Sequence, residues 1–60
     1  MILKDLLLVV PSYQIVEIVV NDERIISGQY ADVKSSITSE MLECEVTSVV
    51  SYKDFLKIWS

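Results

Sequence analysis

Histidine is absent from these 60 residues, and glycine, proline and cysteine occur once each. Without histidine, the Ser-His and Cys-His pairs of hydrolases and the usual near-neutral proton carrier are excluded. A single glycine, Gly28, is too few for the loops that bring the backbone close to nucleotide phosphates, so we expect no nucleotide cofactor. The single cysteine, Cys44, cannot form an internal disulfide, and no Cys/His cluster is available for zinc.

Long apolar runs are missing as well. The run at residues 6–10 is shorter than the roughly 7 to 15 residues of a signal-peptide core, and it follows the Lys4-Asp5 pair. No run approaches the roughly 18 apolar residues of a membrane-spanning helix, so we expect no membrane partner. A free thiol without a targeting segment predicts a cytoplasmic protein.

Positive charge is scarce. The chain has 5 Lys and Arg against 9 Asp and Glu, which gives a net charge of -4. Binding to nucleic-acid phosphates depends on clustered basic residues, and here only oligomerisation could gather Lys34, Lys53 and Lys57 into one stripe. The same acidity suits a protein that presents carboxylates to a basic nucleic-acid-handling protein of a host.

What is present is a high apolar content, 52% of the chain. This content predicts one folded domain over residues 1–60. Leu3, Leu6, Leu7 and Val10 follow helical spacing, and Pro11 ends the pattern, so the sequence predicts a helix over residues 3–10. Because a helix this short is marginal by itself, it should pack on a sheet.

Strand-forming segments fill most of the remaining chain. They cover residues 14–20, 24–30, 45–52 and 55–59, with turns at 21–23 and 53–54. Gly28 inside the second segment indicates a bulge or a close approach by the helix. Residues 32–43 read as a loop with one helical turn. The predicted fold is α+β, a short N-terminal helix packed on a four-stranded antiparallel sheet made of two hairpins.

Strand alternation sorts the side chains onto two faces of this sheet. The predicted core face contains Val16, Ile18, Val20, Ile26, Tyr30, Val46, Val50, Tyr52, Leu56 and Ile58. The opposite face carries polar residues together with six large apolar ones, Ile15, Val19, Ile25, Val49, Phe55 and Trp59.

Scattered exposed apolar residues are normal on a folded protein, and this is one interpretation of the second face. Six of them on one small face would exceed the apolar patch of a typical monomer. We therefore expect a homo-oligomer, formed by stacking these faces, by joining edge strands, or by both. Phe55 and Trp59 are the expected anchors, because large aromatic residues carry much of the energy of protein interfaces.

Carboxylates are the only catalytic groups that the composition offers. Glu17, Asp22, Glu23 and Asp32 lie on or near the first predicted hairpin, where two or three could bind Mg²⁺ for phosphodiester chemistry. The alternative is that they keep an apolar chain soluble. We expect Mg²⁺ only for a nuclease and no other cofactor. Cys44 has no His or cationic cluster to activate it, so it should be inert.

A pattern of apolar positions spans nearly the whole chain. It consists of Leu3-Lys4-Asp5-Leu6-Leu7, Val9-Val10-Pro11, Ile15-x-x-Ile18, Ile25-Ile26-x-Gly28, Asp32-Val33, Leu42-x-x-x-Val46 and Leu56-x-Ile58. In this pattern the chain resembles a group of very short proteins from prophages and mobile elements of Firmicutes, a group that is similar to a small anti-CRISPR protein with an oligomeric β-sheet fold. The chain departs from the group at Lys34-Ser35-Ser36, where acidic residues are usual.

The resemblance implies an accessory protein that counters host defence as a homo-oligomer. It would act on DNA, by nicking or relaxing it, or on a host nucleic-acid enzyme. The resemblance assigns no catalytic residue to this chain. The alternative is a non-catalytic interaction module or small subunit whose apolar sheet face binds a different protein.

Overall fold

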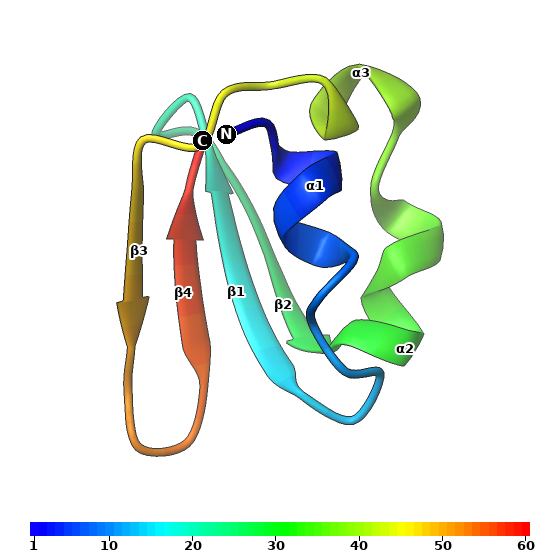
Figure 1. Ribbon diagram of the computed structural model, residues 1–60, viewed down its shortest axis with the longest axis vertical. Helices are drawn as coiled ribbons and strands as arrows, with labels where there is room; N and C mark the ends of the chain where they lie inside the picture. The colour runs from blue at the N-terminus through cyan, green and yellow to red at the C-terminus, as the bar shows by residue number, and fades with distance from the viewer.

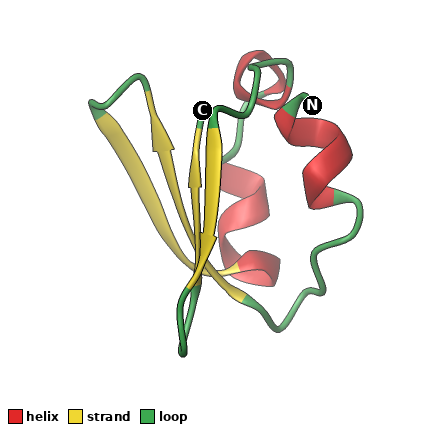
Figure 2. Ribbon diagram, turned by 60° about the vertical axis from the view of Figure 1, so that its left-hand side comes forward, coloured by secondary structure: helices red, strands yellow, loops and turns green.

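The computed structural model describes residues 1–60, apart from the side chain of Arg24. In this described part, four strands form one sheet, and all the helical segments lie on one of its faces (Figures 1 and 2). The strands are β1 (Ile15–Val20), β2 (Arg24–Gln29), β3 (Ser48–Ser51) and β4 (Leu56–Trp59). The helical segments are α1 (Leu3–Leu7), α2 (Tyr30–Val33), the 3-10 turn η1 (Lys34–Ser36) and α3 (Ser39–Leu42).

The sheet has the order β2-β1-β4-β3 and is mixed. Both predicted hairpins are present, because β1 pairs antiparallel with β2 and β3 pairs antiparallel with β4. The hairpins join through β1 and β4, which run parallel. The α+β class is confirmed, and the purely antiparallel sheet is wrong at this one pair.

The order of β3 and β4 in the sheet accords with their burial. Ile58 of β4 is fully buried, whereas all four residues of β3 are exposed. A central strand is shielded on both edges, so the more apolar strand of the second hairpin lies next to β1 and the more polar strand forms the edge. The direction of β4 is set by the helical connector, which returns the chain after β2 to the end of the sheet where β1 ends, so that β3 runs antiparallel to β1 and β4 parallel to it (Figure 1).

The helical segments differ from the prediction in length and number. The predicted helix over residues 3–10 ends at Leu7, and residues 8–9 form a turn before Pro11. The sequence predicts one helical turn in the connector at residues 32–43, but this segment contains the second half of α2 and all of η1 and α3. Tyr30, predicted to end a strand, begins α2. These short segments are stabilised by packing, because none is long enough to persist alone.

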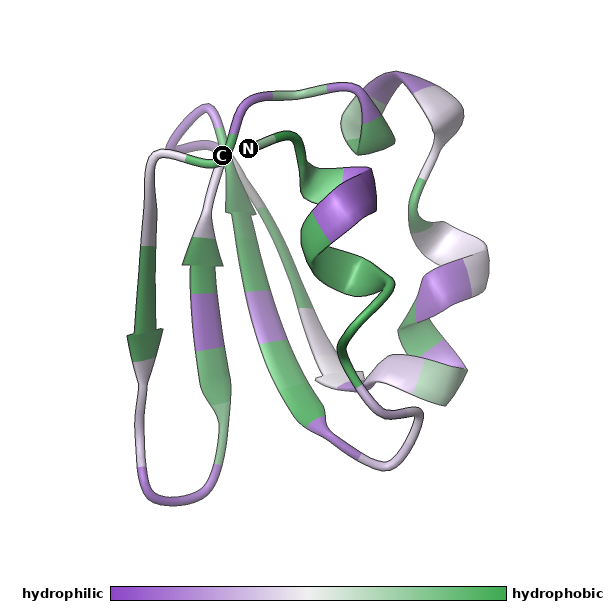
Figure 3. Ribbon diagram, in the orientation of Figure 1, coloured by the Kyte–Doolittle hydropathy of each residue, from purple (hydrophilic) through white to green (hydrophobic). Residues whose placement is uncertain are grey.

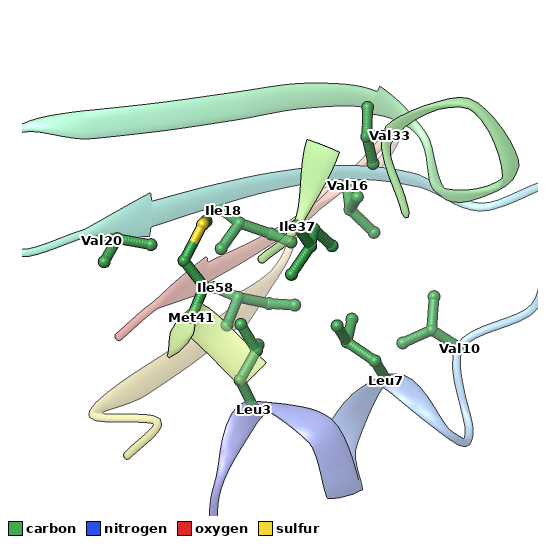
Figure 4. Packing of buried hydrophobic residues seen from close by; sticks show 10 residues of the cluster. All are labelled: Leu3, Leu7, Val10, Val16, Ile18, Val20, Val33, Ile37, Met41 and Ile58. Carbon is green, nitrogen blue, oxygen red and sulfur yellow. The ribbon is translucent and has the colours of Figure 1, made fainter. Parts of the chain in front are cut away.

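One hydrophobic cluster joins the sheet to the helical layer (Figure 4). It consists of Leu3, Leu7, Val10, Val16, Ile18, Val20, Val33, Ile37, Met41 and Ile58. Gly28 lies at a close approach between β2 and α2, because a Cβ built there would lie 3.1 Å from Cγ1 of Val33. The expected close approach is therefore present, and it is made by α2. Among the described residues, no helix has the length and apolarity needed to cross a membrane.

Candidate functional site

The sheet face turned away from the helices, which we call the outer face, is the most distinctive surface of the protein. Residues that are paired in register on neighbouring strands point to the same face of the sheet. The register therefore assigns to this face Ile15, Glu17, Val19, Ile25, Ser27, Gln29, Ser48, Val50, Lys57 and Trp59. Tyr52 and Phe55 extend the alternation into the β3–β4 turn, where the Tyr52 amide donates to the Phe55 carbonyl over 2.8 Å.

No helix covers the outer face (Figure 2), and several of its large apolar side chains are exposed. The exposed fractions are 45% for Ile15, 63% for Ile25, 39% for Val50 and 46% for Tyr52. The rings of Tyr52 and Phe55 stack with centroids 4.7 Å apart. Apolar side chains gathered on one face in this way are typical of protein interfaces.

A single ion pair occupies the middle of the outer face. Nζ of Lys57 lies 3.1 Å from Oε1 of Glu17, and each side chain is about one quarter exposed. The two residues are register partners on β1 and β4, the two central strands, which each show one hydrophilic band in Figure 3. Lys57 also lies over the ring of Trp59, 5.0 Å from its centroid.

The charges of this ion pair cancel. Among the described outer-face residues, Glu17 and Lys57 are the only charged side chains. The outer face therefore carries no net charge, although the chain as a whole carries -4. It combines exposed apolar side chains and the uncharged polar residues Ser27, Gln29 and Ser48 with a central ion pair whose charges cancel.

Five of the six predicted interface residues lie on the outer face. These are Ile15, Val19, Ile25, Phe55 and Trp59. Val19 is buried there between its register partners Ile25 and Trp59. Val49 is the exception, because it pairs with the fully buried Ile58 and so belongs to the helix side.

The predicted faces of β3 are reversed. Val50, predicted in the core, pairs with Lys57 on the outer face and is exposed. Tyr52, also predicted in the core, is exposed and stacks on Phe55. The register of β3 could be predicted from the two-residue turn at 53–54. Such a turn pairs Val50 with Lys57, which the sequence already places on the second face, so Val50 belongs to the same face.

The four candidate catalytic carboxylates do not converge. Glu17 pairs with Lys57 on the outer face, and Asp22 and Glu23 are exposed in the β1–β2 turn. Asp32 belongs to α2, at the opposite end of the sheet from that turn (Figure 1). Within the described residues, no three His, Cys, Asp or Glu side chains gather into a group that could hold a metal ion.

A small hollow lies between the β1–β2 turn and α3. It has a volume of about 230 Å³, and its lining includes Glu23, Glu40 and Cys44. This is below the roughly 300 to 1,000 Å³ of typical ligand sites. The Cys44 thiol lies within it and donates to the Glu40 carbonyl over 3.6 Å. The hollow is therefore a small acidic depression.

No family model, no curated protein and no solved structure matches the chain. The resemblance to mobile-element and anti-CRISPR proteins, and the DNA or host partner that it implies, therefore stay predictions.

Proposed function

We propose that the protein is an interaction module that works as a homo-oligomer, binding through its outer face. The observation that carries this proposal is the combination of an uncovered apolar sheet face with a central charge pair that cancels. Burial of apolar surface supplies the main driving force for protein association, at about 25 cal/mol per Å² removed from water.

Charge supports a second copy as the occupant of the outer face. Two copies of a chain with a net charge of -4 repel each other over most approaches. Apart from Glu17, the carboxylates lie on helices, turns and the segments between them, at Asp5, Asp22, Glu23, Asp32, Glu40, Glu43, Glu45 and Asp54. The outer face is the broad surface on which two copies can meet without facing like charges.

Sedimentation equilibrium tests this proposal, with Ile25→Ser as the variant and Val9→Ser as its matched control. Ile25 is 63% exposed on the outer face, and Val9 is 77% exposed beyond α1, on the helix side. We expect a wild-type dimer at micromolar concentration. In a symmetric dimer the substitution removes two Ile25 side chains from the interface. Ile25→Ser should therefore weaken dimerisation by about tenfold or more, and Val9→Ser should leave it unchanged.

A wild-type mass of 6.8 kDa at these concentrations would contradict the proposal. Aggregation of the purified chain, with solubility restored by Ile25→Ser, would instead indicate that a different protein covers the outer face. Equal weakening by both variants would mean that the outer face is not the contact.

The anti-defence role is the setting that the resemblance implies for such an oligomer. Supercoiled plasmid incubated with the protein in Mg²⁺ or EDTA tests action on DNA directly. EDTA-sensitive conversion to open circle would support nicking, and loss of that activity in Glu17→Gln would implicate this carboxylate. Unchanged plasmid would leave a binding protein whose partner is then to be identified.

A further inference from the structure

We infer that two copies stack outer face on outer face about a two-fold axis parallel to β1 and β4, so that Lys57 of each copy lies opposite Glu17 of the other. This inference rests on the proposed self-association and specifies its geometry. It follows from the position of the ion pair, the strand order and the sizes of the side chains on the outer face.

The ion pair selects the direction of the axis. Glu17 and Lys57 are register partners on adjacent parallel strands, so they lie at the same height on either side of the sheet's midline. A two-fold axis that runs along the strands between them exchanges their positions and brings each charge opposite its counter-charge. An axis across the strands at the same height would place Glu17 opposite Glu17, which electrostatic repulsion disfavours.

The axis along the strands also matches large side chains with small ones. It places β1 over the partner's β4, so that Trp59 faces Val19, which already lies below the surrounding side chains with 7% exposure. It also brings β2 over the partner's β3. Ile25 and Val50, the exposed apolar residues of the edge strands on the outer face, then lie opposite Ser48 and Ser27 of the partner copy, respectively.

The four charges determine the relative orientation of the two copies more than they increase the affinity between them. Each side chain of the ion pair is about one quarter exposed in the single chain, so stacking removes its remaining water. That loss is costly for a buried ion pair unless each charge gains further partners. In the inferred dimer Glu17 and Lys57 of both copies form an alternating ring of four charges, in which every charge has two counter-charges beside it.

A charge-swapped chain tests this geometry. The double variant Glu17→Lys/Lys57→Glu keeps an ion pair between β1 and β4, so it should fold and dimerise with itself as the wild type does. Opposite a wild-type chain, however, the axis along the strands would place like charges together. We therefore expect the two chains to sort, with heterodimers at least about tenfold below the statistical half of an equimolar mixture. Native mass spectrometry with ¹⁵N-labelled wild type measures this fraction.

Each result decides between geometries. Heterodimers at the statistical half would overturn the inference, because the ion pair would then lie outside the interface. An excess of heterodimers would indicate the axis across the strands. If the double variant does not fold, mixing Glu17→Lys with Lys57→Glu tests whether the ion pair lies in the interface. Heterodimers should then form from two monomeric chains, and their absence would overturn the inference. A monomeric wild type would contradict the proposed function itself, which separates that failure from failure of this geometry.

Discussion

Two residues in the β1–β2 turn adopt an unusual backbone conformation. Asn21 and Asp22 have φ angles of 53° and 58°, and the Glu23 amide donates to the Val20 carbonyl over 3.1 Å. Consecutive positive φ values with this hydrogen bond are typical of a type I′ turn, whose twist suits a two-stranded hairpin. Asn tolerates this conformation better than Asp, and glycine tolerates it best.

Asp22→Gly should therefore stabilise the protein. Glycine removes the steric cost of a positive φ at this position, so we expect the free energy of unfolding to rise by about 0.5 to 1 kcal/mol. Urea denaturation followed by circular dichroism measures the change. Asp54→Gly in the β3–β4 turn is the matched control, because Asp54 has no positive φ and the substitution should give no gain. Equal effects of the two variants would refute this explanation.

At the scale of elements, α3 is a single helical turn whose start is defined by one side chain. Thr38 is its N-cap, and the Thr38 hydroxyl accepts a hydrogen bond from the Met41 amide over 3.2 Å. The turn places Met41 in the hydrophobic cluster. Because four residues cannot sustain a helix alone, the cap and this buried side chain hold α3 in place.

Thr38→Ala should destabilise the protein by about 1 kcal/mol, since it leaves an amide at the helix start without its side-chain acceptor. Ser39→Ala is the matched control, because Ser39 is an exposed residue of the same helical turn and is not the N-cap. Thermal unfolding at low concentration, where association contributes little, compares the two. A loss of stability in Ser39→Ala as large as that in Thr38→Ala would contradict the capping role.

At the scale of the whole molecule, the protein buries little apolar surface to offset the conformational entropy that the chain loses on folding. A domain near this length buries only about 60% of the surface that its unfolded chain exposes. The described chain has no disulfide and no metal-binding group of side chains to add to its hydrophobic cluster. Burial of the outer face by a second copy would supplement this interior.

The melting temperature should accordingly depend on protein concentration. If folded chains dimerise and unfolded chains do not, mass action shifts the equilibrium toward the folded state as concentration rises. A tenfold increase should raise the melting temperature by about 3 to 5 °C for a domain of this size. Differential scanning fluorimetry across a concentration series measures it. Ile25→Ser serves as control and should show a smaller shift, and a concentration-independent wild type would count against the dimer.

The sequence by itself determined the local features. The α+β class, both hairpins and the second apolar face follow from alternation, β-branched composition and turn residues, which act over a few neighbouring positions. Five of the six apolar residues expected on the second face lie there for this reason. The two-residue turn at Lys53-Asp54 determines which residues of β3 pair with β4, so the faces of β3 can also be predicted from the sequence. The apolar pattern alone predicts the opposite faces.

Only the tertiary structure decided which segments distant in the chain meet. The parallel pairing of β1 with β4 brings Glu17 beside Lys57, and no local pattern specifies it. The same packing separates Asp32 from Asp22 and Glu23, which the sequence places within one region. The physical reason is that strand order is set by burial of whole segments. The more apolar β4 gains more than β3 from a central position, and the arrangement of charges on the outer face follows from that choice.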